Sequence, residues 1–464
     1  MEQAVFFDAE LIGRYDRQGP RYTSYPTAVQ FHDDFGAAEY RESVAHSNGA
    51  PMPAPLSLYF HIPFCATVCY YCACNKVVTK NRAHAAPYLD SLCREIELQA
   101  ALFDADREVT QLHWGGGTPT FLAPDQMARL MAQTRARFNL VDDAAGEFSI
   151  EIDPRTVDAD GIRNLRALGF NRLSLGVQDF DERVQRAVNR IQPESQTLAI
   201  MAAARTAGFR SISVDLIYGL PFQTVASFER TLERVIAAAP DRLSIFNYAH
   251  LPAMFKVQRQ IDESALPAAP IKLEILKRSI ERLGAAGYVY IGMDHFARPG
   301  DELARAQVEG HLTRNFQGYS THGGCDIVGF GMSSIGSVDD CYAQNERTLE
   351  AYRARIDTGQ LAIARGVSLT ADDRLRRAAI NELVCHFALD TQTFGAAHGV
   401  DFWSYFRAEH APLRAMADDG LLELSTRAIR VLPRGRLLIR NICMVFDAYL
   451  GAGSHAAPRF SRVI

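Results

Sequence analysis

The chain has 464 residues, enough for about three domains or for one large α/β domain with appendages, which excludes a single small module. Its composition, 48% hydrophobic and 22% charged, is that of a globular protein with a large core, so disorder is excluded as the main state. The 49 basic and 54 acidic residues sum to a net charge of −5. Because this leaves no overall basic field to hold nucleic acid or an anionic membrane, local arginines must meet any anionic ligand.

The N-terminus and the cysteines indicate where the protein works. The opening sequence MEQAVFFDAELIGRYDRQG lacks the basic start, apolar core and small-residue cleavage site of a signal peptide. No apolar run approaches the ~20 residues that a membrane span needs. The nine cysteines are odd in number, and four of them lie within residues 65–74, which is not typical of a disulfide framework. We therefore expect a cytoplasmic protein with reduced cysteines and a metal site.

From residue 56 onward, short apolar runs alternate with helix-like segments, a pattern that predicts parallel βα units. One such helix is predicted over 87–103, with Pro87 in its first turn. The predicted strands are 56–62, 109–115, 147–153, 172–178, 211–218 and 243–249. Six consecutive units predict an α/β fold built on a partial (β/α)6 barrel of the TIM type.

The elements beyond the sixth strand are less regular. A strand is predicted over 288–297, and the glycine-rich stretch 323–337 extends the barrel unit toward residue 360. Residues 370–450 are rich in predicted helix, and 423–433 predicts two short strands around a turn, which indicates a small helical, winged-helix-like domain. The predicted parts are an N-terminal segment over 1–50, a catalytic domain over 51–360 and a C-terminal domain over 365–464.

Chemistry in parallel α/β folds gathers at the C-terminal ends of the strands, where this sequence places its polar and glycine-rich segments. They are the cysteine run 65–74, Gly115–Thr120, the carboxylates Glu151 and Asp153, Gln178, and 215–221. We expect these five segments to converge on one rim of the barrel.

The cysteine run CATVCYYCAC has the spacing Cys65-x3-Cys69-x2-Cys72, with Cys74 two positions further on. Thiolates at this density suit a soft centre such as zinc, copper(I) or an iron–sulfur cluster. A four-iron cluster held by only three cysteines leaves one iron open to an exogenous ligand. The residues alone leave open a structural zinc site that uses all four cysteines.

This loop resembles that of the radical S-adenosylmethionine (SAM) superfamily, in which it follows the first strand of a partial barrel. The resemblance implies that Cys65, Cys69 and Cys72 bind a [4Fe–4S] cluster whose open iron is chelated by SAM. Tyr71 matches an aromatic position that lies beside the adenine in this family. Cys74 would stay non-ligating, because a fourth thiolate would close the site that SAM needs, and a plain buried thiol is the alternative.

Over nearly the whole chain the sequence resembles one branch of that superfamily, the oxygen-independent coproporphyrinogen III oxidases. A haem-chaperone-like branch is the alternative; it carries an aromatic residue at the position of Cys74 and lacks the segment RYTSYPTA. The strings that carry the resemblance are RYTSYPTA (21–28), YFHIPF (59–64) with the cysteine run, HWGGGTPT (113–120), EIDPR (151–155), GVQDF (176–180), VNR (188–190), DLIYGLP (215–221), NYAHLP (247–252), FGMSSIG (330–336) and IRNICMVFDAYL (439–450).

The resemblance implies two SAM molecules, with Tyr59 and His61 as catalytic residues on one strand face. The residues implied for the first SAM are Tyr59, Tyr71, Gly115, Gly116, Gly117, Thr118, Glu151, Gln317 and Ile335. Those implied for the second are Gln178, Arg190, Asp215 and the backbone of Ala249.

Simpler structural interpretations stay open for several of these residues. The glycine triplet could form only a tight βα turn, and Glu151 could pair with Arg155. Arg190 could be solvated on a helix face, His61 could be a hydrogen-bonded core histidine, and Ile335 could belong to the core.

The resemblance further implies a reaction: oxidative decarboxylation of two propionate side chains of coproporphyrinogen III to vinyl groups, giving protoporphyrinogen IX without oxygen. The expected partners are this substrate and an electron donor such as a flavodoxin or ferredoxin system, with no nucleic acid and no membrane. We expect a monomer whose N-terminal segment contacts the active site and whose tail helps to cover it. The cationic side chains that hold the substrate carboxylates are not identified, and Arg21 is our hypothesis for one of them, with a surface arginine as the alternative.

A DNA-binding interpretation rests on the basic stretch 427–440 of the winged-helix-like tail. The net charge of −5 and the five converging strand ends argue against it.

Overall fold

The structure is a computed structural model that describes residues 5–142 and 144–450. The chain forms two compact units. We name Gln30–Pro267 with Gly324–Ser368 the sheet unit, and Met1–Val29 with Ala268–Gly323 and Leu369–Ile464 the helical unit. Both units combine distant parts of the chain, and the bounds of the three predicted parts stay a prediction.

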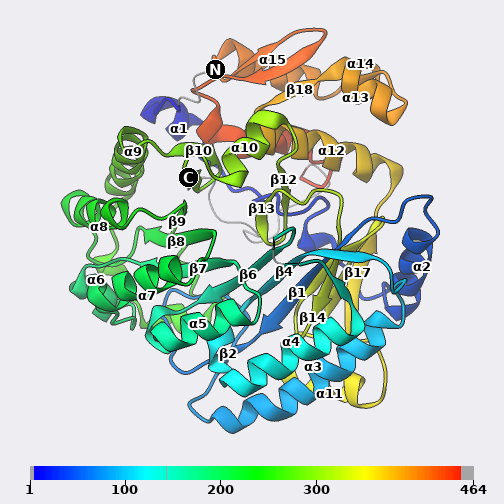
Figure 1. Cartoon of the computed structure of the whole chain (residues 1–464). Helices are drawn as coiled ribbons and strands as arrows, with labels where there is room; N and C mark the ends of the chain where they lie inside the picture. Colours follow the sequence, from blue (N-terminus) through cyan, green and yellow to red (C-terminus); the bar gives the residue numbers. More distant parts are fainter. Residues whose placement is uncertain (1–4, 143, 451–464) are drawn as a thin grey trace. The chain divides into compact units, whose positions relative to one another are not determined.

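Six parallel strands of the sheet unit lie in the order β1-β4-β6-β7-β8-β9, which confirms the predicted partial barrel (Figure 1). Three of them begin and end at the predicted residues. The strands are β1 (Leu56–Ile62), β4 (Glu108–Gly116), β6 (Glu147–Ile152), β7 (Arg172–Gln178), β8 (Ser211–Tyr218) and β9 (Arg242–Asn247).

The strands have one apolar and one polar face because successive side chains alternate. Leu58, Phe60 and Ile62 of β1 are fully buried, and the ring of Phe60 lies 6.0 Å from that of Trp114 on β4. In the other set, Tyr59 is in register with His113 of β4, and His113 is in register with Ser149 of β6. Further along the same faces, Glu151 pairs with Ser174 of β7, and Asp215 of β8 pairs with Ser244 of β9. The apolar set supplies the core, so the polar set is available for chemistry.

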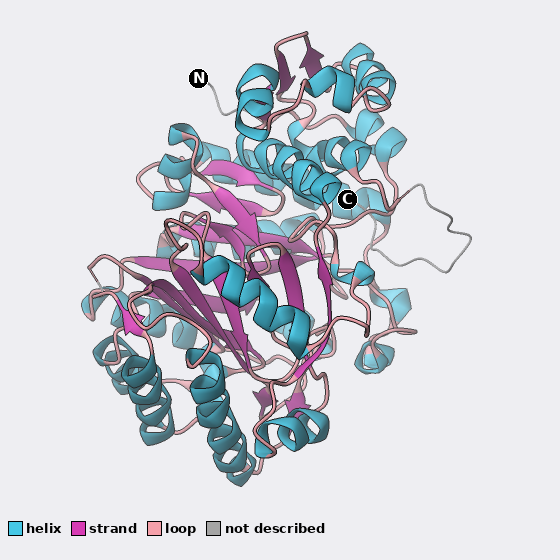
Figure 2. Ribbon diagram, turned by 90° about the vertical axis from the view of Figure 1, so that its right-hand side faces the viewer, coloured by secondary structure: helices cyan, strands magenta, loops and turns pink. Residues whose placement is uncertain are grey.

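Helices connect the parallel strands and run along one side of them; Figure 2 shows the strands in magenta flanked by cyan helices. Asp158 caps α5 and Thr224 caps α8 through their side-chain oxygens, which fixes where these helices begin. The helices of this unit are α2 (Ala37–Asn48), α3 (Ala85–Ala100), α4 (Pro124–Arg137), α5 (Ala159–Ala167), α6 (Glu182–Ala187), α7 (Glu194–Thr206), α8 (Val225–Ala238) and α11 (Leu349–Asp357).

The sheet continues beyond β1 instead of closing. Strand β14 (Asp326–Phe330) is parallel to β1, and β15 (Ile335–Val338), β16 (Cys341–Asn345) and β17 (Ile363–Ser368) follow as antiparallel neighbours. An extension of the barrel unit was predicted over 323–337, whereas β16 and β17 were not predicted. The short strands β2 (Phe64–Cys65), β3 (Val77–Val78) and β5 (Asn139–Leu140) complete the unit.

The helical unit contains the predicted pair of strands near residues 423–433. They are β19 (Leu422–Leu424) and β20 (Ala428–Val431), which form an antiparallel sheet with β18 (Ala388–Asp390). The helices of the unit are α1 (Ala9–Tyr15), α9 (Ala269–Ala285), α10 (Glu302–Glu309), α12 (Ala371–His386), α13 (Thr391–His398), α14 (Phe402–Tyr405), α15 (His410–Asp418) and α16 (Ile439–Cys443).

The prediction of one strand over 288–297 is wrong. The segment is a hairpin of β10 (Val289–Gly292) and β11 (His295–Ala297), with positive φ angles of 148° at Gly292 and 55° at Met293. The apolar run hid the turn because Met293 takes a left-handed conformation that non-glycine residues rarely adopt. A second hairpin follows, formed by β12 (Thr313–Asn315) and β13 (Gly318–Ser320).

The N-terminal residues of the helical unit pack on its C-terminal helices. The Arg440 guanidinium donates to the carbonyl oxygens of Gly19 and Pro20, and Tyr22 donates to Asp447 at 2.9 Å. Arg21 is paired with Asp294 at 2.6 Å, so its predicted role toward a substrate carboxylate stays a hypothesis.

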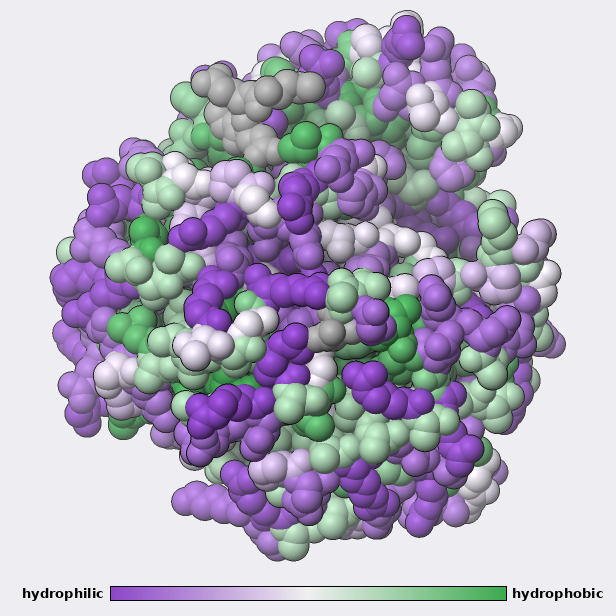
Figure 3. All heavy atoms as spheres, viewed as in Figure 1, coloured by the Kyte–Doolittle hydropathy of each residue, from purple (hydrophilic) through white to green (hydrophobic). Residues whose placement is uncertain are grey.

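Across the described residues, no helix has both the length and the apolar character that crossing a bilayer would require. Hydrophilic side chains cover much of the face drawn in Figure 3, with hydrophobic ones interspersed.

Candidate active site

A cavity of about 250 Å³ lies at the C-terminal ends of the parallel strands. Residues from all five predicted strand-end segments line it. The predicted site residues among them are Cys65, Cys69, Tyr71, Cys72, Gly116, Gly117, Thr118, Glu151, Gln178, Arg190 and Asp215. The other lining residues are Thr67, Cys74, Lys76, Ile152, Asp153, Arg155, Ser174 and Gly176.

The cysteine run 65–74, which we call the cysteine loop, is held by hydrogen bonds to two neighbouring loops. Tyr70 N–H donates to the Val188 carbonyl at 3.0 Å, and the Asn189 side chain donates to the Val68 carbonyl at 2.8 Å. From the loop after β9, the buried Gln258 donates through Nε2 to the Tyr71 carbonyl at 3.1 Å. The loop that carries the three thiols is therefore fixed from both flanks.

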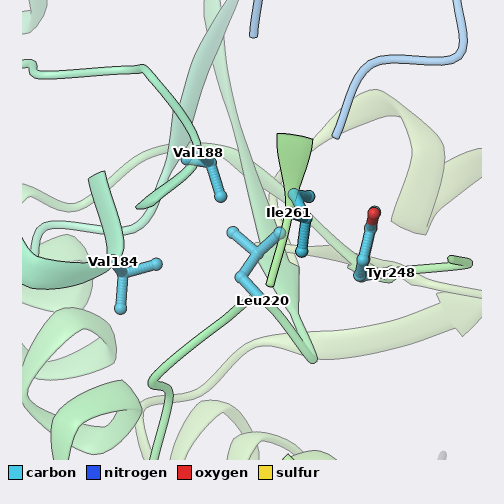
Figure 4. Close-up of a cluster of buried hydrophobic side chains, with 5 residues drawn as sticks. All are labelled: Val184, Val188, Leu220, Tyr248 and Ile261. Carbon is cyan, nitrogen blue, oxygen red and sulfur yellow. The ribbon is translucent and has the colours of Figure 1, made fainter. Parts of the chain in front are cut away.

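A hydrophobic cluster lies beside the cysteine loop and reinforces these bonds. Figure 4 shows its five buried members, and Tyr70 and Tyr71 pack against the cluster. The cluster consists of Val184, Val188, Leu220, Tyr248 and Ile261.

The glycine rim, which we define as Gly115–Thr118 after β4, is built by close backbone approach. A Cβ on Gly117 would lie 2.6 Å from the carbonyl oxygen of Pro63, just ahead of Cys65. Gly116 has a φ of 112°, and a Cβ there would lie 2.8 Å from the His61 ring. Only glycine fits such positions, so the rim packs the strand edge against the cysteine loop. Thr118 adds a hydroxyl 3.5 Å from the sulfur of Cys65.

Glu151 faces the glycine rim, and its proposed pairing with Arg155 is not present. Its carboxylate accepts from Gly116 N–H at 3.1 Å and from His113 Nε2 at 3.4 Å. Burial raises the pKa of Glu151, but the hydrogen bond and charge of His113 outweigh it and hold the pKa below the usual value. The carboxylate is therefore ionised and available to a cationic ligand.

Three charged side chains of the lining form the arginine rim, which we define as Asp153, Arg155 and Arg190. Asp153 Oδ2 accepts from Arg155 Nη2 at 2.6 Å and from Arg190 Nη1 at 3.1 Å. Burial raises the pKa of Asp153, but the charge of Arg190 and the hydrogen bond from Arg155 hold it below its usual value. Arg190 is buried, so the solvated position considered for it is wrong.

The part of the cavity between β7 and β8 carries a third carboxylate, Asp215. Asp215 accepts from Ser174 at 2.9 Å, and burial raises its pKa to about 6. Gln178 ends β7 with a φ of 68°, and its buried Oε1 has no hydrogen-bond partner among the described residues. An orphaned buried amide oxygen beside a cavity indicates a place for a ligand donor.

Tyr59 and His61 do not line the cavity, although they share a face of β1. His61 Nε2 donates to the Asn75 carbonyl at 3.0 Å, which leaves Nδ1 to accept from the Tyr59 hydroxyl at 3.2 Å. Burial lowers the pKa of His61, which favours the neutral imidazole.

Four further predicted residues lie outside the cavity lining. Gly115 is on β4, where a Cβ would lie 3.0 Å from the Glu151 carboxylate. Ala249 follows β9, and its carbonyl accepts from Gln258 at 3.3 Å. Ile335 begins β15 and is only partly buried, and Gln317 is in the β12–β13 turn of the helical unit.

Known proteins resemble the chain over its whole length. A model of the radical SAM superfamily matches residues 59–235, and a model of the HemN C-terminal domain matches residues 369–438. The oxygen-independent coproporphyrinogen III oxidase of Pseudomonas aeruginosa is 54% identical, and the match covers 100% of both chains. The protein of the same name from Escherichia coli is 50% identical, with 100% of this chain and 99% of its own covered.

A solved structure agrees with these sequence matches. The coproporphyrinogen III oxidase (HemN) from Escherichia coli, described as a radical SAM enzyme, matches with a TM-score of 0.92, at 50% identity over 96% of this chain and 100% of its own. The chain belongs to the oxygen-independent coproporphyrinogen III oxidase family. The expected radical SAM fold is thereby confirmed, and membership of the superfamily implies a [4Fe–4S] cluster and SAM.

The cavity fits these cofactors of the family. In the described part of the chain, no three His, Cys, Asp or Glu side chains gather as ligands of one metal ion. A cluster takes its thiolates on separate irons, and Cys65, Cys69 and Cys72 all line one cavity. The orphaned Gln178 oxygen and the ionised Glu151 carboxylate supply acceptors for a polar, cationic ligand such as SAM.

The sequence placed Asp153 at the expected rim without a partner, and it did not indicate that Ser174 and Arg155 line the cavity. Ser174 alternates with apolar residues on β7, so the two-residue period of the strand could have predicted that its side chain faces the cavity. The arginine rim gave no such signal, because Asp153 and Arg190 are 37 residues apart and meet only in the folded barrel.

Proposed function

We propose that this chain catalyses the oxygen-independent oxidative decarboxylation of coproporphyrinogen III, converting two propionate side chains to vinyl groups and giving protoporphyrinogen IX. It is an oxidoreductase of haem biosynthesis by its family. The observation that carries the proposal is the match to relatives of this name at 54% and 50% identity across the full chain. The cavity, with its three thiols, supports it from the structure.

Cys65, Cys69 and Cys72 would hold the cluster. When bound, the cluster and SAM supply a reducing electron and the carbon radical that removes hydrogen from the propionate β-carbon. The chain itself binds and orients the cofactors and the substrate and excludes water from them. The loops after β7 and β9 fix the cysteine loop. Cys74 stays outside the ligand set as a cavity-lining thiol.

Two SAM subsites are proposed at the cavity. At the first, the ionised Glu151 and the glycine rim offer acceptors to the amino group, and Tyr71 offers a ring to the adenine. The remaining residues proposed there are Tyr59, Gln317 and Ile335. At the second, the orphaned Gln178 oxygen and the Asp215 carboxylate accept hydrogen bonds, and Arg190 and the Ala249 backbone complete the set.

Tyr59 and His61 are proposed as catalytic residues. Their hydrogen bond fixes the tyrosine hydroxyl, and the neutral His61 ring is anchored by the Asn75 carbonyl. The pair can therefore hold a proton at the Tyr59 oxygen without adding charge.

The electron donor is proposed to be an external flavodoxin or ferredoxin system. A monomeric state and a cytoplasmic location also stay proposals.

The proposal is tested anaerobically. Reconstituted protein is given reductant, SAM and coproporphyrinogen III, and protoporphyrinogen IX and 5′-deoxyadenosine are measured together with iron and sulfide content. Formation of both products is expected. SAM cleavage without conversion of the porphyrinogen would overturn the substrate, and zinc in place of iron would overturn the radical chemistry.

A further inference from the structure

Two guanidinium groups of the arginine rim point at the sulfur of Cys69. Arg190 Nη1 lies 3.5 Å from Cys69 Sγ, and Arg155 Nη2 lies 3.7 Å from the same atom. N–H donors strengthen toward sulfur when the thiol is ionised, because the contact is then charge-assisted. Cys65 has a different environment, since a neutral Thr118 hydroxyl lies beside its sulfur at 3.5 Å.

The two arginines are held in place independently of Cys69. The Arg155 side chain is 19% exposed and that of Arg190 is 7% exposed, so neither is a mobile surface group. Arg155 follows β6 in a short 3-10 helix, Pro154–Thr156, and donates Nε to Asp153 at 3.0 Å in addition to the bond from Nη2. Arg190 also donates Nη2 to the Gly176 carbonyl at 2.5 Å.

The charges around Cys69 do not cancel. Two guanidinium groups face one carboxylate, Asp153, so the three side chains carry one net positive charge next to this sulfur. Arg190 already has a proposed place in the second SAM subsite, whereas Arg155 has no other assigned role. Its partners are the Asp153 carboxylate, which fixes it, and the Cys69 sulfur.

We propose that Arg155 is a positioning residue that raises the reduction potential of the [4Fe–4S] cluster through Cys69; this rests on the cluster ligation proposed above. Reduction adds one negative charge to the cluster. A positive charge and an N–H donor at a ligand sulfur stabilise the reduced state more than the oxidised state, so they raise the potential. The arginine rim thereby makes the cluster easier to reduce by an external donor.

The test measures the cluster potential, not turnover. Wild-type protein and the variants Arg155→Gln, Arg155→Lys and Arg163→Gln are reconstituted anaerobically and titrated with reductant without SAM or substrate, and the reduced cluster is followed by electron paramagnetic resonance. Arg163→Gln is the matched control, because Arg163 is an exposed arginine on α5 that pairs with Asp160. Its substitution removes the same charge as Arg155→Gln but at a site away from the cavity lining. Iron, sulfide and thermal unfolding are recorded for each protein.

We expect Arg155→Gln to have a lower midpoint potential than wild type at equal cluster content. Arg155→Lys keeps the charge but lacks the planar guanidinium that reaches Asp153 and Cys69 together. Its midpoint potential should therefore lie between those of wild type and Arg155→Gln. Arg163→Gln should match wild type.

An unshifted potential in Arg155→Gln at full cluster content would overturn the inference. If that variant fails to assemble a cluster, Arg155→Lys decides, and a wild-type potential in it overturns the inference equally. A wild-type protein with no reducible cluster would instead overturn the proposed function.

Discussion

The two rims of the cavity position their functional groups by different physical means. At the glycine rim, missing side chains let backbone approach backbone, so Gly117 lies against the carbonyls of Pro63 and Phe64. At the arginine rim, opposite charges hold long side chains, with Asp153 between Arg155 and Arg190. The glycine rim depends on shape and the arginine rim on charge. We therefore expect substitutions at the two rims to impair the protein in different ways.

The largest effect is expected at the glycine rim. Gly117→Ala would place a Cβ 2.6 Å and 2.8 Å from two backbone carbonyl oxygens, which cannot move without shifting the strand that leads to Cys65. We expect a loss of about 3 kcal/mol in unfolding free energy and little or no cluster after reconstitution. Gly284→Ala, where nothing lies within 4 Å of the new Cβ, is the control. Normal cluster content in Gly117→Ala would contradict the steric account.

Glu151→Gln tests whether the glycine rim also needs charge. The change keeps the shape but removes the ionised acceptor for a cationic ligand, so SAM affinity should fall about 10- to 100-fold, the range for hydrogen bonds to charged groups. Equilibrium SAM binding to the reconstituted protein measures it. Glu97→Gln, at a half-exposed carboxylate paired with Arg137, should leave the affinity unchanged. Unchanged binding in Glu151→Gln would remove this carboxylate from the subsite.

Another buried carboxylate, Glu95, extends the contrast, because its hydrogen-bond partners among the described residues carry no positive charge. It accepts from Gly331 N–H, Asn345 and Tyr352, and burial raises its pKa to about 7. A raised acid pKa means that the folded state holds the proton more tightly. The contribution of Glu95 to the unfolding free energy is therefore largest below its pKa in the unfolded chain, and it falls as the pH rises toward its pKa in the folded protein.

For Glu95 this predicts a loss of ~2 kcal/mol between pH 5 and pH 7, where the folded state binds more protons than the unfolded state. Denaturant unfolding at the two pH values measures it. Glu95→Gln should lack this part of the pH dependence, whatever its absolute stability. An equal slope in wild type and variant would show that Glu95 is ionised throughout.

The smallest effect is expected at the anchor of the cysteine loop. Gln258→Ala removes the donor to the Tyr71 and Ala249 carbonyls and the acceptor of Leu251 N–H at 2.6 Å. We expect a loss of about 1 kcal/mol in unfolding free energy and slower cluster assembly. Gln260→Ala, exposed in the same 3-10 helix, should behave as wild type. Equal assembly rates would show that the hydrophobic cluster holds the loop without Gln258.

Local signals in the sequence were enough for much of the barrel. β1, β7 and β8 follow the predicted bounds because a strand buried on one face alternates with period two over its whole length. The hairpin at 288–297 was missed because its turn is made by an apolar residue, Met293. Strands β16 and β17 were missed because their pairing joins segments separated by a helix.

The family, the parallel strands and the thiol spacing could be predicted from the amino-acid sequence, since these reside in contiguous motifs and in periodicity. The hydrogen-bond and ion-pair partners of the site residues became known only from the folded chain. It gave Glu151 to Gly116 and His113 instead of Arg155, and it brought Arg155 and Arg190 together at Cys69. Such contacts join residues from different βα units, and their geometry exists only once the strands lie side by side.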